Sequence, residues 1–296
     1  MKNQTTVSVV IPFYSDHSGL LEVAVESALN QTLINLEVIV VDDCSPLSAK
    51  DELENITDSR LKIIRHAVNS NGGIARNTGI DNAEGKFIAF LDYDDIWHVD
   101  KLERQLNSFT EVSKARSKVV IYSQCKIIEG EISRVAPSRA IEVDESVGDY
   151  LFSAQQIIQT SGIFLLASSA KEARFHDLRR HQDYQFCLSL EKLGYIFHML
   201  SSASYDFVQM PKKNNYEFSK YWLGEYEAYL TDTAILSFNK LVLCRALLSH
   251  RCYITAFVES RDKGYLRYFA KALIIYIVKN HIPLLALYLK KRRLKN

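Results

Sequence analysis

The chain has 296 residues, 47% of them hydrophobic and 24% charged, an ordinary composition for a globular protein with one large domain or a domain and an appendage. Its formal net charge of +1 at pH 7 provides no overall attraction to nucleic acid, which we therefore exclude from the expected partners. Charge is unevenly placed, since residues 290–296 hold five cations and no acid.

The five cysteines are scattered along the chain, and none of them lies in a CxxC pair. This spacing argues against a disulfide framework and against a zinc site, and it is typical of a reducing compartment. The N-terminal residues enter an apolar, strand-like run directly. We therefore expect no signal peptide and a cytoplasmic protein.

Short apolar runs alternate with helical patterns through the first half of the chain. The runs predicted to be strands cover residues 7–12, 36–41, 61–65, 87–91 and 119–124. Their almost continuous apolar character is typical of strands covered on both faces. Helices are predicted around the stripe of Leu21, Ala24, Val25 and Ala28, and over residues 74–83 and 101–112. This alternation predicts an α/β fold with a doubly wound, mostly parallel sheet.

The pattern changes after about residue 130. The predicted elements are then a loop over residues 131–148, an apolar segment crossing beneath a ligand over 157–167, a helix over 183–193 and a strand over 195–199. From residue 217 onward, dense Leu, Tyr and Ala predict mostly helix. We therefore divide the chain into a domain over residues 1–215 and a helical region over residues 216–296.

Polar residues gather where three of the predicted strands end. Residues 13–16 follow the first strand, Asp42 and Asp43 follow the second, and residues 92–95 follow the fourth. In doubly wound sheets, ligands bind beyond the carboxyl ends of the strands. The three groups therefore predict one binding site at this edge of the sheet.

Asp92 and Asp94 form a DxD pattern, which can hold a metal ion. On an extended segment the two carboxylates would point to the same side and meet a divalent cation such as Mn²⁺ or Mg²⁺. Such an ion keeps open positions for water and a substrate diphosphate. The alternative is that these aspartates only form a turn. The preceding strand and the following Trp97 favour the metal site.

Three further residues have both a functional and a purely structural interpretation. Asp43 can bond a ribose hydroxyl or a base edge, or it can cap a helix or turn. Arg76 can reach a diphosphate or a base, or it can be a solvated side chain. Asp183 can be a general base for an acceptor hydroxyl, or it can be the N-cap of the helix that follows.

In their order along the chain, these segments resemble the family 2 glycosyltransferases with the GT-A fold. The stretches that carry the resemblance are residues 7–14, 27–32, 36–45, 71–79, 85–97 and 182–190. Together they span about the first 200 residues, and the ordered set is far more specific than any one of its members.

The resemblance implies a role for each matching residue. Pro12 and Tyr14 would line the nucleotide base, and Asp43 would contact the base or the ribose. Arg76 would lie near the base or the diphosphate. Asp92 and Asp94 would be the DxD pair on the donor and its cation, with Asp94 as the direct metal ligand. Asp183 would be the catalytic base.

The resemblance also implies an activity, namely inverting transfer of a sugar from a nucleotide-sugar donor. The donor would be UDP-linked, because members of the family commonly use UDP-sugars. The acceptor would be a hydroxyl of a glycan or of a lipid-linked molecule in bacterial surface polysaccharide synthesis. The chain departs from the family pattern at two positions. Gln182 replaces the usual Glu before the base, and Cys44 replaces a common Gly, from which we expect a turn without positive φ.

Two other functions stay open at this point. A nucleotidyltransferase also uses an α/β nucleotide fold and metal-binding carboxylates, but it normally has a Gly-rich basic loop where this chain has residues 12–14. A non-catalytic subunit that binds sugar nucleotides is the other alternative, and Gln182 is the feature that favours it.

The helical region has two possible surfaces for partners. Tyr216, Tyr221, Trp222 and Tyr226 could stack on sugar rings or form a helical core. The apolar stretches of residues 265–294 are interrupted by charged residues and Pro283, so they do not predict a membrane-spanning helix. Helices lying on an anionic membrane surface, at the inner face of the plasma membrane, are one interpretation. A helical bundle packed on the catalytic domain is the other.

Overall fold

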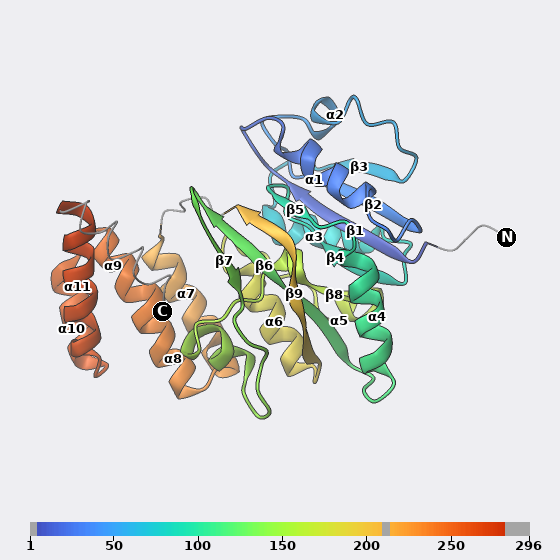
Figure 1. The fold of residues 1–296 in the computed structure, drawn as a ribbon. Coiled ribbons are helices and arrows are strands. Elements are labelled where there is room, and N and C mark those ends of the chain that lie inside the picture. The colour runs from blue at the N-terminus through green and yellow to red at the C-terminus, as the bar shows by residue number, and fades with distance from the viewer. Residues whose placement is uncertain (1–4, 209–213, 282–296) are drawn as a thin grey trace. The chain divides into compact units, whose positions relative to one another are not determined.

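The computed structural model describes residues 5–208 and 214–281, with side chains to residue 278. The chain divides into two compact units, Met1–Pro211 and Lys212–Asn296, which we describe separately. Figure 1 shows that the first unit is built around a sheet and that the second consists of helices.

A single mixed sheet runs through the first unit. Its strands are β1 (Val7–Phe13), β2 (Leu36–Asp42), β3 (Leu61–Arg65), β4 (Phe87–Phe90), β5 (Asp95–Trp97), β6 (Val119–Glu129), β7 (Ile132–Ala136), β8 (Phe164–Leu166) and β9 (Ile196–Val208). Their order is β3-β2-β1-β4-β8-β6-β9-β5, and β7 pairs with β6 beside this path. Strands β1 to β4 are parallel, as are β6 and β9, whereas β5, β7 and β8 pair antiparallel. The predicted α/β class is confirmed. Most of the parallel strand pairs lie among the N-terminal strands β1 to β4.

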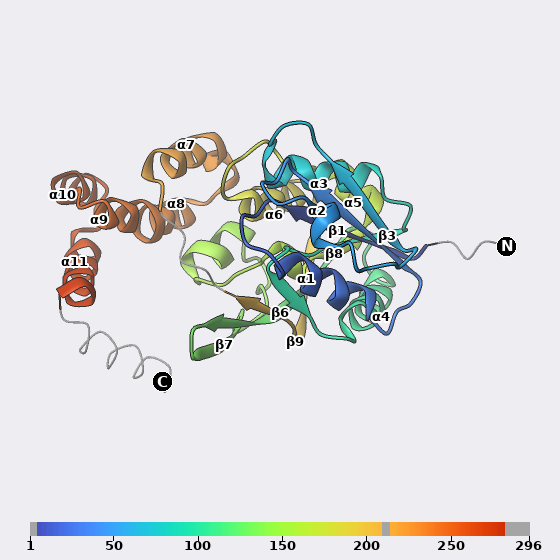
Figure 2. The same ribbon diagram turned by 90° about the horizontal axis from the view of Figure 1, so that it is seen from above.

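Helices cover both faces of the sheet. They are α1 (Leu20–Leu29), α2 (Ala49–Glu52), α3 (Asn71–Asp81), α4 (Lys101–Ser113), α5 (Ala167–Ala173) and α6 (Gln182–Lys192). Figure 2 shows α1 and α4 on one side of the sheet and α3, α5 and α6 on the other. Because both faces are covered, every residue of β1, β2 and β4 is buried, which explains their continuous apolar sequences.

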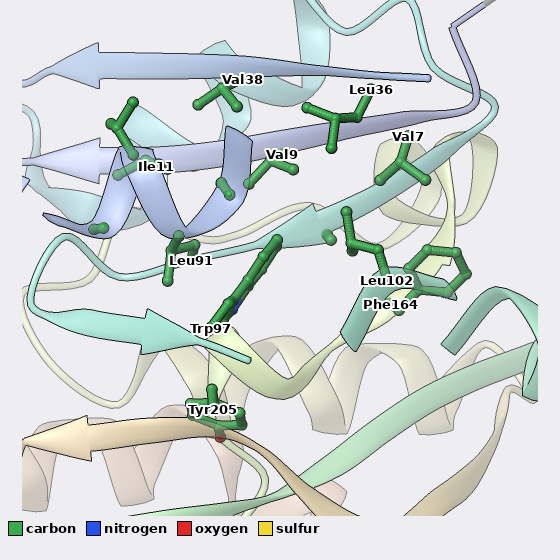
Figure 3. Close-up of a cluster of buried hydrophobic side chains, with 14 of the residues drawn as sticks. Val7, Val9, Ile11, Leu36, Val38, Leu91, Trp97, Leu102, Phe164 and Tyr205 are labelled. Atoms are coloured by element: carbon green, nitrogen blue, oxygen red, sulfur yellow. The ribbon is translucent and has the colours of Figure 1, made fainter. Parts of the chain in front are cut away.

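Alternate residues of the central strands enter different hydrophobic clusters, as the pleat of a strand requires. Val38 of β2 joins the large cluster beneath α1 and α4, whereas its neighbour Ile39 packs with Ala75 of α3. Figure 3 shows Ile11, Val38 and Trp97 in the large cluster. The doubly wound packing therefore follows from strands that carry apolar side chains on both faces.

Some elements differ from the predicted ones. A β-hairpin of β6 and β7 occupies the start of the segment expected to be a loop. A loop was predicted there because the mixed polar and apolar residues of β7 form no continuous apolar run. Strand β9 extends to Val208 through pairing with β6 and β5. Helix α3 begins at Asn71 rather than at residue 74. The prediction placed the start too late because Gly72 and Gly73, in the first turn, are poor helix formers.

The second unit contains α7 (Tyr216–Tyr226), α8 (Asp232–Phe238), α9 (Arg245–Ser249), α10 (Tyr253–Asp262) and α11 (Leu266–His281). Trp222 is fully buried and stacks on Tyr226 and Phe238, with ring centroids 5.0 and 5.1 Å away. Core packing therefore accounts for these aromatic residues, whereas Tyr221 is exposed. Within the described parts of the chain, no helix combines the length and apolar character needed to cross a membrane.

Close packing of α3 on β1 requires a glycine at position 79. A Cβ atom there would lie 2.2 Å from Cγ1 of Val10, a buried and stiff side chain. We expect Gly79→Ala to destabilise the first unit by about 2 kcal/mol and to lower its melting temperature by roughly 4–8 °C in calorimetry.

Gly224→Ala is the matched control, because a Cβ at this α7 position would meet nothing within 4 Å. It should leave stability unchanged or raise it by up to about 1 kcal/mol. Equal melting temperatures for the two variants would contradict the packing argument.

Candidate active site

The DxD aspartates lie in a tight turn after β4. The N–H of Asp95 donates to the carbonyl of Asp92 at 3.0 Å, so residues 92–95 form a β-turn. The expectation of an extended segment was therefore wrong, because β5 begins at Asp95 and the chain must turn before it. Asp92 and Asp94 are both partly exposed at this turn.

Arg76 of α3 joins this turn to the start of α6. Its Nη2 donates to Asp92 Oδ1 at 2.5 Å, and its Nη1 donates to Gln182 Oε1 at 2.8 Å. The guanidinium lies over the ring of Phe175, 5.4 Å from the ring centroid. Arg76 is only 7% exposed, so the interpretation as a solvated side chain was wrong. The Arg76 guanidinium thus connects Gln182, the residue before the candidate base, to Asp92 of the DxD turn.

Two hydroxyl residues that we did not single out in the sequence hold the same turn. Thr160 Oγ1 donates toward both oxygens of Asp92, at 3.1 and 3.2 Å. Ser161 Oγ accepts the N–H of Asp92 at 2.9 Å and donates to Asp95 Oδ2 at 2.5 Å. Trp97 Nε1 donates to the carbonyl of Ser161 at 3.2 Å. Trp97 is buried and therefore supports the site from the core.

Asp42 and Asp43 follow β2 together but have different environments. Asp42 accepts the N–H groups of Ser45 and Ala49 and pairs with Arg65 at 2.5 Å. Asp42 therefore has the capping role in this turn, which we had considered for its neighbour Asp43. Asp43 accepts the N–H of Ser70 at 2.8 Å through Oδ1, while its buried Oδ2 has no hydrogen-bond partner among the described residues. Asp43 thus retains an acceptor that a ligand could use.

Cys44 adopts a left-handed conformation with φ of 56°. The expectation that Cys in place of Gly avoids positive φ was therefore wrong. The turn is fixed on both sides of Cys44, because Ser45 N–H bonds Asp42 and Ser45 Oγ bonds both N and O of Ser15. These bonds offset the cost of a left-handed residue, about 1–2 kcal/mol.

Pro12 and Tyr14 lie at the carboxyl end of β1. The pairing of β1 with β4 ends at Val10, so the absent N–H of Pro12 leaves no sheet hydrogen bond unmade on that side. Pro12 is buried, whereas Tyr14, just beyond the strand, is 50% exposed. The sheet edge therefore presents an exposed aromatic ring near Asp43, whose N–H donates to the carbonyl of Phe13.

Asp183 lies in the first turn of α6. His181 occupies the N-cap position with φ of 60°, and Asp183 Oδ1 accepts the N–H of Tyr184 at 3.0 Å. The N-cap interpretation of Asp183 is therefore not supported. A carboxylate in a first helical turn is favoured by the helix dipole. Gln182, whose Nε2 donates to the carbonyl of Leu178 at 2.5 Å, keeps the start of this helix in contact with Arg76.

The carboxylates fit a cation that protein and substrate share. Among the described residues, no group of three or more His, Cys, Asp or Glu converges to bind a metal. Mg²⁺ usually binds through one or two carboxylates together with substrate phosphates and water. Protein donors contact Asp92, both Asp92 and Asp94 are partly exposed, and direct binding of a metal by either carboxylate stays a prediction.

Comparison with known proteins finds one family. The chain matches the profile described as "Glycosyl transferase family 2" over residues 8–150. It is 33% identical to the amylovoran biosynthesis glycosyltransferase AmsB of Erwinia amylovora over 245 residues, which are 78% of this chain and 81% of that protein. It is 38% identical to the Escherichia coli UDP-Glc:alpha-D-GlcNAc-diphosphoundecaprenol beta-1,3-glucosyltransferase WfgD over 102 residues, 34% of this chain and 40% of that protein.

A solved structure has the same fold. The crystal structure of S. aureus TarS 1-349 in complex with UDP aligns with a TM-score of 0.58 and 21% identity. The alignment covers 98% of this chain and 87% of the other. At this identity the likeness concerns the fold, which is the GT-A arrangement expected from the sequence.

The environment of His181 predicts how stability depends on pH. Burial, with a smaller contribution from the charge of Arg180, lowers the pKa of His181 from its usual 6.5 to about 4. Between pH 6.5 and about 4 the unfolded chain therefore binds a proton that the folded chain does not, and stability is lost as the pH falls. His181→Asn, which tolerates positive φ, should reduce the loss between pH 7 and pH 5 by about 1–2 kcal/mol in urea denaturation.

All other titrating groups are the same in the two proteins, so the difference between their pH profiles isolates His181. Parallel profiles for wild type and His181→Asn would contradict the burial of an uncharged imidazole.

Proposed function

The chain belongs to glycosyl transferase family 2, and from this premise we propose that it transfers a sugar from a UDP-linked donor to an acceptor hydroxyl with inversion at the anomeric carbon. The acceptor is a glycan or a lipid-linked saccharide in the synthesis of a bacterial surface polysaccharide. The names of two relatives support this choice, since AmsB is an amylovoran biosynthesis glycosyltransferase and WfgD uses a UDP-sugar and a diphosphoundecaprenol-linked acceptor.

The observation that carries the proposal is the bridge formed by Arg76. One buried guanidinium contacts both Asp92 of the DxD turn and Gln182, the residue before Asp183. Asp92 and the residue next to Asp183, which are distant in sequence, therefore belong to one hydrogen-bonded assembly. A transferase that acts by a single displacement needs this proximity, because the donor phosphates and the base must flank the same anomeric carbon.

The donor lies along the carboxyl edge of β1, β2 and β4. Tyr14 covers the base, Pro12 lines the floor beneath it, and Asp43 accepts a hydrogen bond from the nucleoside through Oδ2. The unpaired, buried state of that oxygen supports this assignment, because a buried acceptor without a partner costs about 1–3 kcal/mol until a ligand provides a donor. Asp92, oriented by Arg76 and Thr160, faces the ribose and diphosphate side of the donor.

A divalent cation, Mn²⁺ or Mg²⁺, would supply charge neutralisation to the departing nucleoside diphosphate when bound. Asp94 is the residue that would hold it, with the substrate phosphates as further ligands. Asp92 keeps its role in the turn and in the pairing with Arg76. With one aspartate holding the cation and the other fixing the turn, the site would not need three or more protein ligands, and the described residues contain no such group.

Asp183 acts as the base on the acceptor side. Its carboxylate accepts the proton of the acceptor hydroxyl as the oxygen attacks the anomeric carbon, and the nucleoside diphosphate leaves from the opposite face. The neighbouring Gln182 adds no charge, so Asp92 is the carboxylate that balances Arg76. The amide also satisfies the Leu178 carbonyl, which a carboxylate in its place could not do.

Separate loss of the two carboxylate functions tests the mechanism. Asp183→Asn should reduce kcat by about 10²–10⁴-fold and leave the affinity for UDP-sugar within about 3-fold, because the base does not bind the donor. Asp94→Ala should instead abolish the effect of Mn²⁺ on UDP binding. The measurements are release of nucleoside diphosphate from a panel of donors and calorimetric titration with UDP, each with and without Mn²⁺.

Near wild-type turnover in Asp183→Asn would remove this residue from the role of base. The same donor panel addresses the other functions considered for the sequence. A nucleotidyltransferase would release pyrophosphate rather than a nucleoside diphosphate, and a non-catalytic subunit would bind a donor without consuming it.

The second unit supplies a membrane-binding surface in this proposal. Ile254, Phe257 and Val258 form an exposed stripe on α10 beside the exposed Arg261. Leu266, Ala270, Ile274 and Ile277 form a second exposed stripe on α11, flanked by the exposed Arg267 and Lys271. Apolar stripes bordered by cations are typical of helices that lie in the interface of an anionic bilayer. Such binding at the inner face of the plasma membrane brings the enzyme to a lipid-linked acceptor.

Flotation with vesicles tests this surface. Ile254→Glu and Ile274→Glu, at positions 82% and 62% exposed, should together lower binding to vesicles with about 30% phosphatidylglycerol by 5-fold or more, because each places a charge in the apolar stripe. Val143→Glu changes a 92% exposed valine of the first unit and should have no effect. Equal binding of all variants, or binding by none including the wild type, would refute the membrane surface.

A further inference from the structure

His66 holds Asp43 in one orientation. Its Nδ1 lies 2.8 Å from Asp43 Oδ1, and its Nε2 lies 2.9 Å from Thr78 Oγ1 of α3. The backbone N–H of His66 donates to the carbonyl of Asp42 at 2.8 Å. The imidazole is therefore fixed at both ring nitrogens and at its backbone.

The proton on His66 Nδ1 follows from the partner. An ionised carboxylate can only accept a hydrogen bond, so Nδ1 carries the hydrogen whether the ring is neutral or charged. The hydroxyl of Thr78 can donate or accept and therefore suits either state of Nε2. The hydrogen bond between His66 and Asp43 thus runs from Nδ1–H to the carboxylate.

Asp43 has one saturated and one unused oxygen. Oδ1 receives both the His66 ring and the N–H of Ser70, at 2.8 Å each, whereas Oδ2 is buried without a partner among the described residues. Asp43 itself is 2% exposed. A half-turn of the carboxylate would only exchange its two equivalent oxygens, so one oxygen stays bonded to His66 and Ser70 and the other is left as the unused acceptor. An acceptor held in this way is complete only when a ligand donates to it.

We propose that His66 is a positioning residue for recognition of the donor nucleoside, acting through Asp43 rather than by touching the nucleotide. By engaging Oδ1, it leaves Oδ2 as the acceptor for an N–H of the base or an O–H of the ribose. This inference rests on the proposed use of a nucleotide-sugar donor. It adds a residue that lies within the profile match over residues 8–150 but between two of the stretches singled out in the sequence, residues 36–45 and 71–79.

Two substitutions separate the bonds that His66 makes. The shorter amide of His66→Asn would place an N–H where Nδ1 lies, so this variant should keep the bond to Asp43 and bind UDP within about 3-fold of wild type. His66→Gln places its amide nearer the position of Nε2, so it should keep Thr78 but release Asp43 and lose about 10-fold in UDP affinity. Thr78→Val removes the far support alone and should lose about 3-fold.

The choice of nucleotide distinguishes positioning from a general loss of structure. The probes are UDP, CDP, which lacks the N–H at the base N3 position, and dideoxy-UDP, which lacks both ribose hydroxyls. If Oδ2 accepts from the N3–H of uracil, His66→Gln weakens UDP and dideoxy-UDP but not CDP. If it accepts from the ribose, the variant weakens UDP and CDP but not dideoxy-UDP. Either pattern supports the proposal, with kcat unchanged within about 3-fold at saturating donor.

Equal loss for all three nucleotides, or full UDP affinity in His66→Gln, would overturn the positioning role. His66→Ala provides the same comparison if His66→Gln does not fold. A wild-type protein that binds UDP and consumes a UDP-sugar while His66→Gln behaves identically refutes this inference alone. A wild-type protein that binds none of the probes refutes the proposed donor and this inference with it.

Discussion

The ion pair between Arg76 and Asp92 is the contact on which the site depends. A guanidinium that is 7% exposed needs a charged partner, since loss of one member of a buried pair typically costs about 3–5 kcal/mol. Asp92 supplies the charge, and Gln182 and Phe175 occupy two further sides of the same group. One side chain therefore holds together three elements of the first unit: α3, the turn after β4 and the start of α6.

Helix α3 can place Arg76 there because small residues let it approach its neighbours. A Cβ at Gly79 would collide with Val10 of β1, and one at Gly73 would lie 2.7 Å from the carbonyl of His176. The same helix carries Thr78, which supports His66 and through it Asp43. One helix packed tightly on the sheet thus orders the nucleoside end and the phosphate end of the proposed donor site, and the chemistry at either end relies on backbone packing.

The paired aspartates at this edge of the sheet differ in their surroundings. Asp42 and Asp92 are surrounded by protein donors and shape the turns after β2 and β4. Asp43 and Asp94 follow them with an unused acceptor in one case and a partly exposed carboxylate in the other. A rigid residue beside each of these carboxylates helps to fix the direction of that carboxylate, which is what preorganised binding of a cation or a nucleoside requires.

Local pattern was sufficient for the α/β class, for the central strands and for the candidate residues, because buried parallel strands must be continuously apolar and their polar ends must meet at one edge. The sequence could not reveal Thr160, Ser161 or His66, since a hydroxyl or an imidazole in a mixed segment has no periodic signal. It also misled at Cys44 and at the DxD turn, where Ser45 and Ser161 accept backbone hydrogen bonds that override the local preference. The sequence alone determined the residue types of the site and their order. The pairing of Arg76 with Asp92 and Gln182 was decided only by the tertiary structure, because these residues are far apart in the chain and meet only when the backbone has folded.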